Sequence, residues 1–153
     1  MRLHAESGDF QLGVILSRYT NLTTLQLPPD GKWTAAGVAG LASSPKIQEL
    51  SVTAACPEVL NSLAGLSQLV CLHLAGVTAD VSGFPWDSLT LLKRLSLRIP
   101  LEAPPKIALD SLSNMTQLQY LHVRNAGLPG PHGLQALTGL TRLNYSMGHD
   151  CKH

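Results

Sequence analysis

The sequence predicts an α/β solenoid, a stack of short parallel strands joined by helical or irregular turns, and three observations support this class. Leucine supplies 29 of the 153 residues, whereas only 14% of residues are charged and 5% are aromatic. One apolar pattern recurs six times at steps of 22 to 26 residues, a period typical of repeat architectures. Proline and glycine cluster between the copies, and these residues favour turns over continued strands.

Each copy of the pattern has an apolar residue, two variable residues, a second apolar residue, one variable residue and a third apolar residue. The six copies are Leu22/Leu25/Leu27, Ile47/Leu50/Val52, Leu69/Leu72/Leu74, Leu92/Leu95/Leu97, Leu118/Leu121/Val123 and Leu140/Leu143/Tyr145. The last two apolar residues of a copy are two apart, so in a strand they point to the same face. We therefore expect six parallel strands, centred near Leu25, Leu50, Leu72, Leu95, Leu121 and Leu143.

Apolar residues spaced by three precede the strands, as in Leu60, Leu63 and Leu66 before Leu69. This spacing suits one or two helical turns followed by a tight bend. Short helices or turns should therefore form a second layer, opposite the exposed face of the strands. We expect Trp86 to replace an aliphatic residue in this layer of the fourth repeat.

The stretches LAGLSQLVCLHL (63–74) and LSNMTQLQYLHV (112–123) carry the pattern most completely. In these two stretches the chain resembles the leucine-rich-repeat family, whose consensus is LxxLxLxxN/CxL. The resemblance covers about residues 10 to 148 and implies a curved right-handed superhelix of about six repeats. Parallel strands would line its concave face, and short helices or turns its convex face. The family's Asn position holds Asp30, Ala55, Val77, Pro100, Ala126 and Gly148.

Because none of these six residues is Asn or Cys, we expect the family's ladder of side-chain to backbone hydrogen bonds to be missing. The convex connections should then be irregular. The length suits one domain with its own core. We expect a single leucine-rich-repeat domain over residues 1–153, with residues 146–153 as a C-terminal tail.

Composition and termini exclude several classes of protein. The formal net charge of +1 argues against a globally basic nucleic-acid binder, and no apolar run is long enough for a membrane span. The three cysteines are odd in number and widely spaced, and no signal peptide is visible, so we expect reduced thiols and an intracellular, cytoplasmic protein. We expect no metal, no cofactor and no small-molecule substrate.

The outward side chains of successive strands should form columns on the concave face. The fourth to sixth repeats would gather cations and aromatic rings there, and the third would add a histidine. The expected partner-binding residues are His73, Arg94, Arg98, Tyr120, His122, Arg124 and Arg142. We expect the four arginines to have no acidic neighbour, and such guanidinium groups bind carboxylates or phosphates through two hydrogen bonds.

These patterns favour a non-enzymatic protein–protein interaction scaffold, a subunit or adaptor in a larger assembly. Cys71 and His73 share a strand, but no carboxylate is placed to orient the histidine for nucleophilic catalysis. One alternative is a subunit that contacts RNA with the Arg-rich half of the concave face, whose affinity would fall steeply with salt. Another is the substrate-recognition part of a ubiquitin-ligase adaptor.

Overall fold

The fold was obtained as a computed structural model. It describes residues 12, 16, 18–27, 33–44, 46–53, 57–77, 81, 83–100, 112–124, 137 and 144–148, the last segment by its backbone alone.

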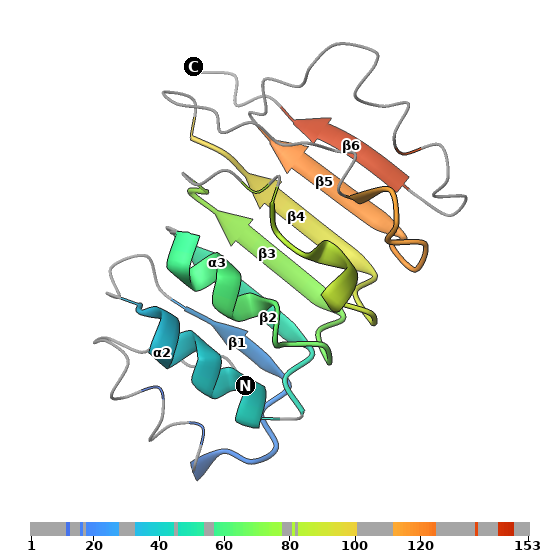
Figure 1. The fold of residues 1–153 in the computed structure, drawn as a ribbon. Helices are drawn as coiled ribbons and strands as arrows, with labels where there is room; N and C mark the ends of the chain where they lie inside the picture. The colour runs from blue at the N-terminus through green and yellow to red at the C-terminus, as the bar shows by residue number, and fades with distance from the viewer. Residues whose placement is uncertain are drawn as a thin grey trace.

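Six strands form one sheet in the described part of the chain, and they lie side by side in sequence order (Figure 1). All five neighbouring pairs are parallel. The strands are β1 (Thr24–Gln26), β2 (Glu49–Thr53), β3 (Cys71–Ala75), β4 (Arg94–Arg98), β5 (Tyr120–Arg124) and β6 (Asn144–Gly148). Consecutive parallel strands require a crossover connection each time, as the repeated turns predicted.

The first five predicted strand centres are confirmed. Leu25, Leu50, Leu72, Leu95 and Leu121 follow one another as register partners. Each of these leucines is at most 1% exposed, so they form one continuous buried column through the sheet. The second inward column contains Val52, Leu74, Leu97 and Val123, which are also buried.

The predicted position of the sixth strand is wrong by two residues. Leu121 pairs with Tyr145 and not with Leu143, and β6 runs to Gly148, so residues 146–148 of the expected tail belong to the strand. Leu143, Tyr145 and Met147 alternate with polar or small residues. A shift of two residues therefore leaves the same parity of residues on each face, and the apolar pattern could not distinguish the two registers.

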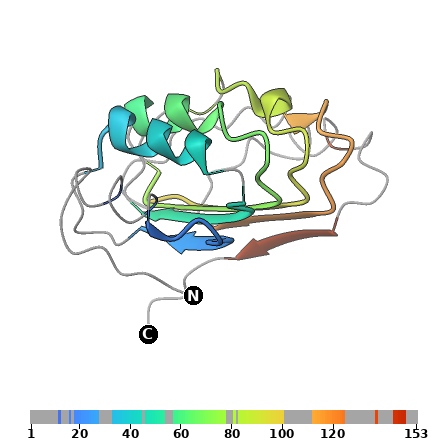
Figure 2. The ribbon, with the colours of Figure 1, turned by 90° about the horizontal axis from the view of Figure 1, so that it is seen from below.

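Helices and turns cover one face of the sheet, as Figure 2 shows. They are α2 (Ala35–Ala39), η1 (Gly40–Ser43), α3 (Pro57–Leu63) and η2 (Trp86–Ser88). Thr34 caps α2 by accepting a hydrogen bond from Gly37 N at 3.4 Å, and Pro57 suits the first position of α3 because it has no N–H to leave unpaired. Trp86 is 1% exposed, which confirms its predicted place in this layer.

A recurrent turn leads into each of the first five strands. The residue three before the central leucine donates its N–H to the carbonyl three residues further back. The five bonds are Leu22 N to Tyr19 O, Ile47 N to Ser44 O, Leu69 N to Leu66 O, Leu92 N to Leu89 O and Leu118 N to Met115 O, at 2.9–3.2 Å. The spacing of three in the sequence therefore reflects a tight turn whose apolar residues face the core.

Glutamine side chains connect neighbouring repeats at these turns. Gln68 and Gln117 each lie four residues before the central leucine of their repeat. Gln68 Nε2 donates to Ser44 O at 3.4 Å, and Gln117 Nε2 donates to Leu89 O at 3.1 Å. In each case the acceptor is a turn carbonyl of the preceding repeat, six residues before the central leucine of that repeat. These bonds give the chain an inter-repeat ladder at a position different from the family's Asn.

The same position in the fourth repeat holds Leu91, which is 54% exposed. Its counterpart acceptor would be Leu66 O. We expect Leu91→Gln to raise the free energy of unfolding by about 0.5–1.5 kcal/mol, because it would add a hydrogen bond and remove an exposed apolar side chain. Gln117→Leu is the matched reverse change and should lower stability. Urea melts of both variants test this, and a fall in stability for Leu91→Gln would contradict the ladder.

Candidate functional site

The face of the sheet opposite the helices corresponds to the predicted concave face, and we call it the open face. It consists of the outward side chains of β1 to β5. Within these strands the outward residues follow the predicted columns in register. The first column is Thr24, Glu49, Cys71, Arg94 and Tyr120, the second is Gln26, Ser51, His73, Ser96 and His122, and the third is Thr53, Ala75, Arg98 and Arg124.

The open face thus brings together six of the seven predicted partner-binding residues. His73, Arg94, Arg98 and Tyr120 are exposed, and His122 and Arg124 are half-buried. The seventh residue, Arg142, lies outside the described residues. Its predicted place beside Tyr120 is wrong, since Tyr120 pairs with Asn144.

Arg94 has an acidic neighbour, contrary to the sequence prediction. Arg94 Nη2 forms an ion pair with Glu49 Oε1 at 2.9 Å. Thr24 Oγ1 donates to the other carboxylate oxygen at 3.2 Å. Glu49 and Arg94 lie two strands apart, and the residue between them in the column is Cys71. Because cysteine is short, the guanidinium can extend over it, and Cys71 is only 4% exposed.

Cys71 and His73 are in contact, with Sγ and Nε2 3.3 Å apart. Burial raises the pKa of the Cys71 thiol, and the opposing effect of Arg94 is smaller. Burial also lowers the pKa of His73, and the Arg94 charge lowers it further. Near neutral pH this favours a protonated thiol beside a neutral imidazole. A nucleophilic cysteine needs the opposite arrangement, a thiolate stabilised by a cation.

Strand β5 presents a strip of three large polar side chains along its length. The rings of Tyr120 and His122 are nearly parallel, with an interplanar angle of 11° and centroids 6.4 Å apart. His122 Nδ1 is buried and makes no hydrogen bond with the described residues. Arg124 follows on the same strand and pairs in register with Arg98 of β4. Cations and aromatic rings are therefore concentrated on β4 and β5.

The other half of the open face is hollowed. A depression of about 190 Å³ is lined by Thr24, Leu25, Gln26, Glu49, Leu50, Ser51 and His73. Its polar groups are hydroxyls, an amide, an imidazole and the paired carboxylate of Glu49. The depression lies over β1 to β3, so the open face combines a shallow neutral half with a cationic half.

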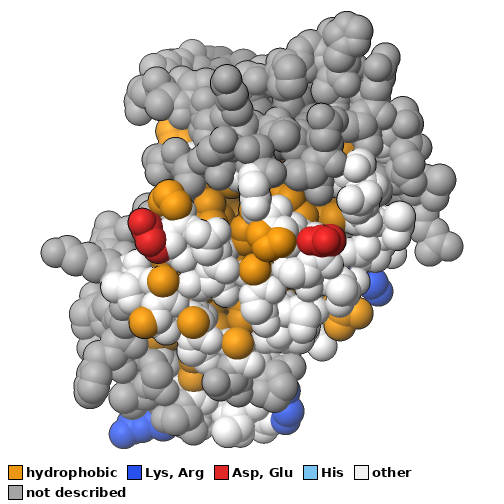
Figure 3. All heavy atoms as spheres, viewed as in Figure 1, with side chains coloured by type: hydrophobic (Ala, Val, Ile, Leu, Met, Phe, Trp, Pro, Cys, Tyr) orange, Lys and Arg blue, Asp and Glu red, His pale blue; other side chains and the backbone are white. Residues whose placement is uncertain are grey.

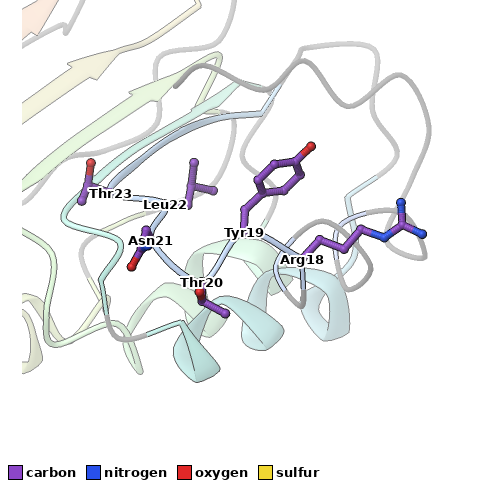
Figure 4. A pocket seen from close by; sticks show the side chains of 6 residues that line it. All are labelled: Arg18, Tyr19, Thr20, Asn21, Leu22 and Thr23. Carbon is purple, nitrogen blue, oxygen red and sulfur yellow. The ribbon is translucent and has the colours of Figure 1, made fainter.

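A larger hollow of about 350 Å³ lies at the turn before β1 and is lined by residues 18–23. Figure 4 shows Arg18 and Tyr19 extending away from Thr23 and the start of β1. Among the lining residues that the structure describes, Arg18 is the one charged side chain, and none carries a carboxylate, thiol or imidazole. The hollow therefore offers no acid–base or nucleophilic group among its described residues.

The helix-bearing face differs in character. Figure 3 shows hydrophobic side chains spread over α2 and α3, with the Lys and Arg side chains at the margins of the view. Exposed small residues there include Ala36, Ala39 and Pro57. Within the described ranges, no helix has both the length and the apolar composition needed to cross a membrane. No group of three or more His, Cys, Asp or Glu side chains suited to a metal ion occurs there either.

Comparison with known proteins relates the chain to solved structures only. No protein-family profile matches it, and no curated protein matches it in sequence. An internalin (inlF) from Listeria monocytogenes aligns with a TM-score of 0.53 and 20% identity, over 88% of this chain and 36% of the internalin. Internalin C2 from the same organism aligns with a TM-score of 0.49 and 17% identity, over 93% of this chain and 76% of that one.

Internalins are leucine-rich-repeat proteins. The chain spans 36% of the length of the first internalin, so the likeness concerns the repeat architecture alone. Together with the parallel sheet and its helical outer layer, it shows that this chain has a leucine-rich-repeat-like fold.

Proposed function

We propose that the chain is a non-enzymatic protein-interaction module of the leucine-rich-repeat type, a subunit or adaptor that binds a protein partner with its open face. The observation that carries the proposal is the strip on β5, where Tyr120, His122 and Arg124 lie beside Arg98. Tyrosine and arginine are enriched among the residues that dominate binding energy. Solenoids commonly bind through the surface formed by their strands.

The architecture in this proposal is a single domain of about six repeats over residues 1–153. Its superhelix is right-handed, because crossovers between parallel strands are right-handed in nearly all proteins. The pKa directions of Cys71 and His73 support a non-enzymatic role. We place the protein inside the cell, in the cytoplasm, where an unpaired thiol such as Cys71 stays reduced.

The RNA-binding alternative is less well supported by the open face. Of its three described arginines, Arg94 is already paired with Glu49. The affinity for a polyanion increases with the number of phosphates that cations neutralise. The pairing of Arg94 with Glu49 therefore lowers the electrostatic contribution to RNA affinity. No described contact favours the ubiquitin-ligase adaptor over another adaptor.

Site-specific photo-crosslinking tests the proposal. A photoreactive amino acid placed at Gln26 or Tyr120, both exposed on the open face, should give discrete protein adducts in an extract of the native source. The same group at Ala39, exposed on α2, is the matched control and should give none. Adducts from Ala39 alone, or adducts that disappear with nuclease, would contradict a protein partner on the open face.

A further inference from the structure

Resting on the proposed function, we propose that the depression over β1 to β3 binds an uncharged carboxamide side chain, from Asn or Gln, of the protein partner. The volume of the depression is about 190 Å³. The residues that line it are Thr24, Leu25, Gln26, Glu49, Leu50, Ser51 and His73. The side chains of Leu25 and Leu50 face the core and are 1% exposed, so their backbone forms the floor. The other five residues have polar side chains.

A short side chain between two longer ones gives the depression its shape. Gln26, Ser51 and His73 are register partners on β1, β2 and β3, so they follow one another at about 4.8 Å. Gln26 and His73 are exposed, and Ser51 between them is half-buried. Thr24 and Glu49 border the depression from the neighbouring column, two residues earlier on their strands. A side chain that enters the depression therefore meets polar groups of both columns.

Three of these polar groups have hydrogen-bonding capacity left for a partner. The side chains of Gln26 and Ser51 form no hydrogen bond with other residues that the structure describes. His73 contacts Cys71 Sγ through Nε2 at 3.3 Å, which leaves its Nδ1. Burial lowers the pKa of His73, and the charge of Arg94 lowers it further, so the imidazole is neutral near pH 7. Together an amide, a hydroxyl and a neutral ring nitrogen can both donate and accept hydrogen bonds.

The charges at the depression are balanced, which favours an uncharged occupant. Among the described lining residues the one carboxylate is that of Glu49. Its Oε1 pairs with Arg94 Nη2 at 2.9 Å, and its Oε2 accepts a hydrogen bond from Thr24 Oγ1 at 3.2 Å. A cationic side chain would compete with Arg94 for the carboxylate, and an anionic one would be repelled by Glu49. Either ion would also lose hydration without gaining an unpaired opposite charge.

A carboxamide matches the free groups better than the other uncharged side chains. Its oxygen accepts hydrogen bonds and its NH₂ group donates two. It can therefore accept from the Ser51 hydroxyl or His73 Nδ1 while it donates to the amide oxygen of Gln26. The hydroxyl of Ser or Thr has only one donor and a shorter reach. An apolar side chain would displace water from Gln26 and Ser51 without replacing its hydrogen bonds, and such unpaired groups oppose binding.

Nuclear magnetic resonance titration of the isotope-labelled full chain tests the proposal. The probes are tripeptides with blocked ends, namely Gly-Gln-Gly, its charged isostere Gly-Glu-Gly and the apolar Gly-Leu-Gly. We expect the Gln peptide to shift the backbone amide signals of Gln26, Ser51 and His73. It should bind about three- to tenfold more tightly than the other two, the factor that one net hydrogen bond supplies.

Two serines of one column provide a matched pair of variants. Ser51→Ala removes a hydroxyl from the depression and should abolish the preference for the Gln peptide. Ser96 is the register partner of His73 on β4 and is not among the lining residues, so Ser96→Ala should leave the preference unchanged. Both serines are half-buried, and melting curves verify that the variants fold. Gln26→Met, at an exposed position, removes the amide and should also abolish the preference.

Equal binding of the three peptides, or a preference that survives both Ser51→Ala and Gln26→Met, would overturn the proposal. Tighter binding of methyl glucoside than of the Gln peptide would also overturn it, because the depression would then be a saccharide site. If the peptides bind equally while a photoreactive group at Tyr120 still gives protein adducts, only the carboxamide site is refuted. Without adducts the proposed function itself fails, and with it the partner that this site requires.

Discussion

Replacing Leu72 with alanine is expected to lower the free energy of unfolding by about 2–5 kcal/mol, the range for truncating a buried leucine. Leu72 is fully buried on β3, and its register partners Leu50 and Leu95 are buried on both sides. Both partners belong to hydrogen-bonded strands and cannot move far to fill the space. The substitution should therefore leave most of the cavity open, which places the effect in the upper part of the range.

Leu25→Ala is the matched comparison. Leu25 is as buried as Leu72, with 1% exposure, but β1 ends the described sheet and pairs only with β2 there. Each repeat of a solenoid is stabilised by its two neighbours, so an end repeat can relax or fray more readily. We expect a smaller loss for Leu25→Ala in urea melts. Equal losses below one kcal/mol at both sites would be incompatible with a buried column through the stack.

The strand positions could be predicted because stacking of parallel strands requires apolar residues on their inward face, and those residues form the sequence pattern. The central leucines of neighbouring strands, such as Leu50, Leu72 and Leu95, all face the core. The number of residues between two of them is set by the length of the crossover that joins their strands. At the sixth strand this reasoning fails. Leu143, Tyr145 and Met147 all have the same parity, so the pattern determines the face but not the register, which depends on contacts with β5.

The members of the open face could be predicted, but their interactions could not. Alternation along the strands is enough to place Tyr120 and Arg124 on one face. The ion pair between Glu49 and Arg94 depends on the small side chain of Cys71 between them, since a bulky residue there would block the contact. Opposite charges on either side of a short residue in one column are the signal that could have indicated this pair. The glutamine ladder was missed because position four before the central leucine lies outside the apolar pattern.

The fourth repeat differs from its neighbours in how its outer layer is filled. Nine residues before the central leucine, the second, third and fifth repeats place Leu41, Leu63 and Leu112, all fully buried, and this repeat places Trp86. Three residues further back, where Val38 and Leu60 are buried, it has the exposed Gly83. The aromatic rings of Trp86 and Phe84, with centroids 4.5 Å apart, fill the layer in place of aliphatic side chains.

Trp86→Ala should accordingly lower the free energy of unfolding by about 3–5 kcal/mol, as expected for truncating a buried tryptophan. The indole is 1% exposed and its Nε1–H donates to Val81 O at 3.3 Å, so the change removes packing and one of the two hydrogen bonds that this carbonyl accepts, the other coming from Phe84 N at 3.2 Å. Trp86→Phe keeps a ring but not the donor, and we expect it to cost about 1–2 kcal/mol. Urea melts followed by circular dichroism give both values. A loss for Trp86→Ala no greater than that for Trp86→Phe would mean that the indole packs loosely, and that Phe84 and Val81 can close the outer layer without it.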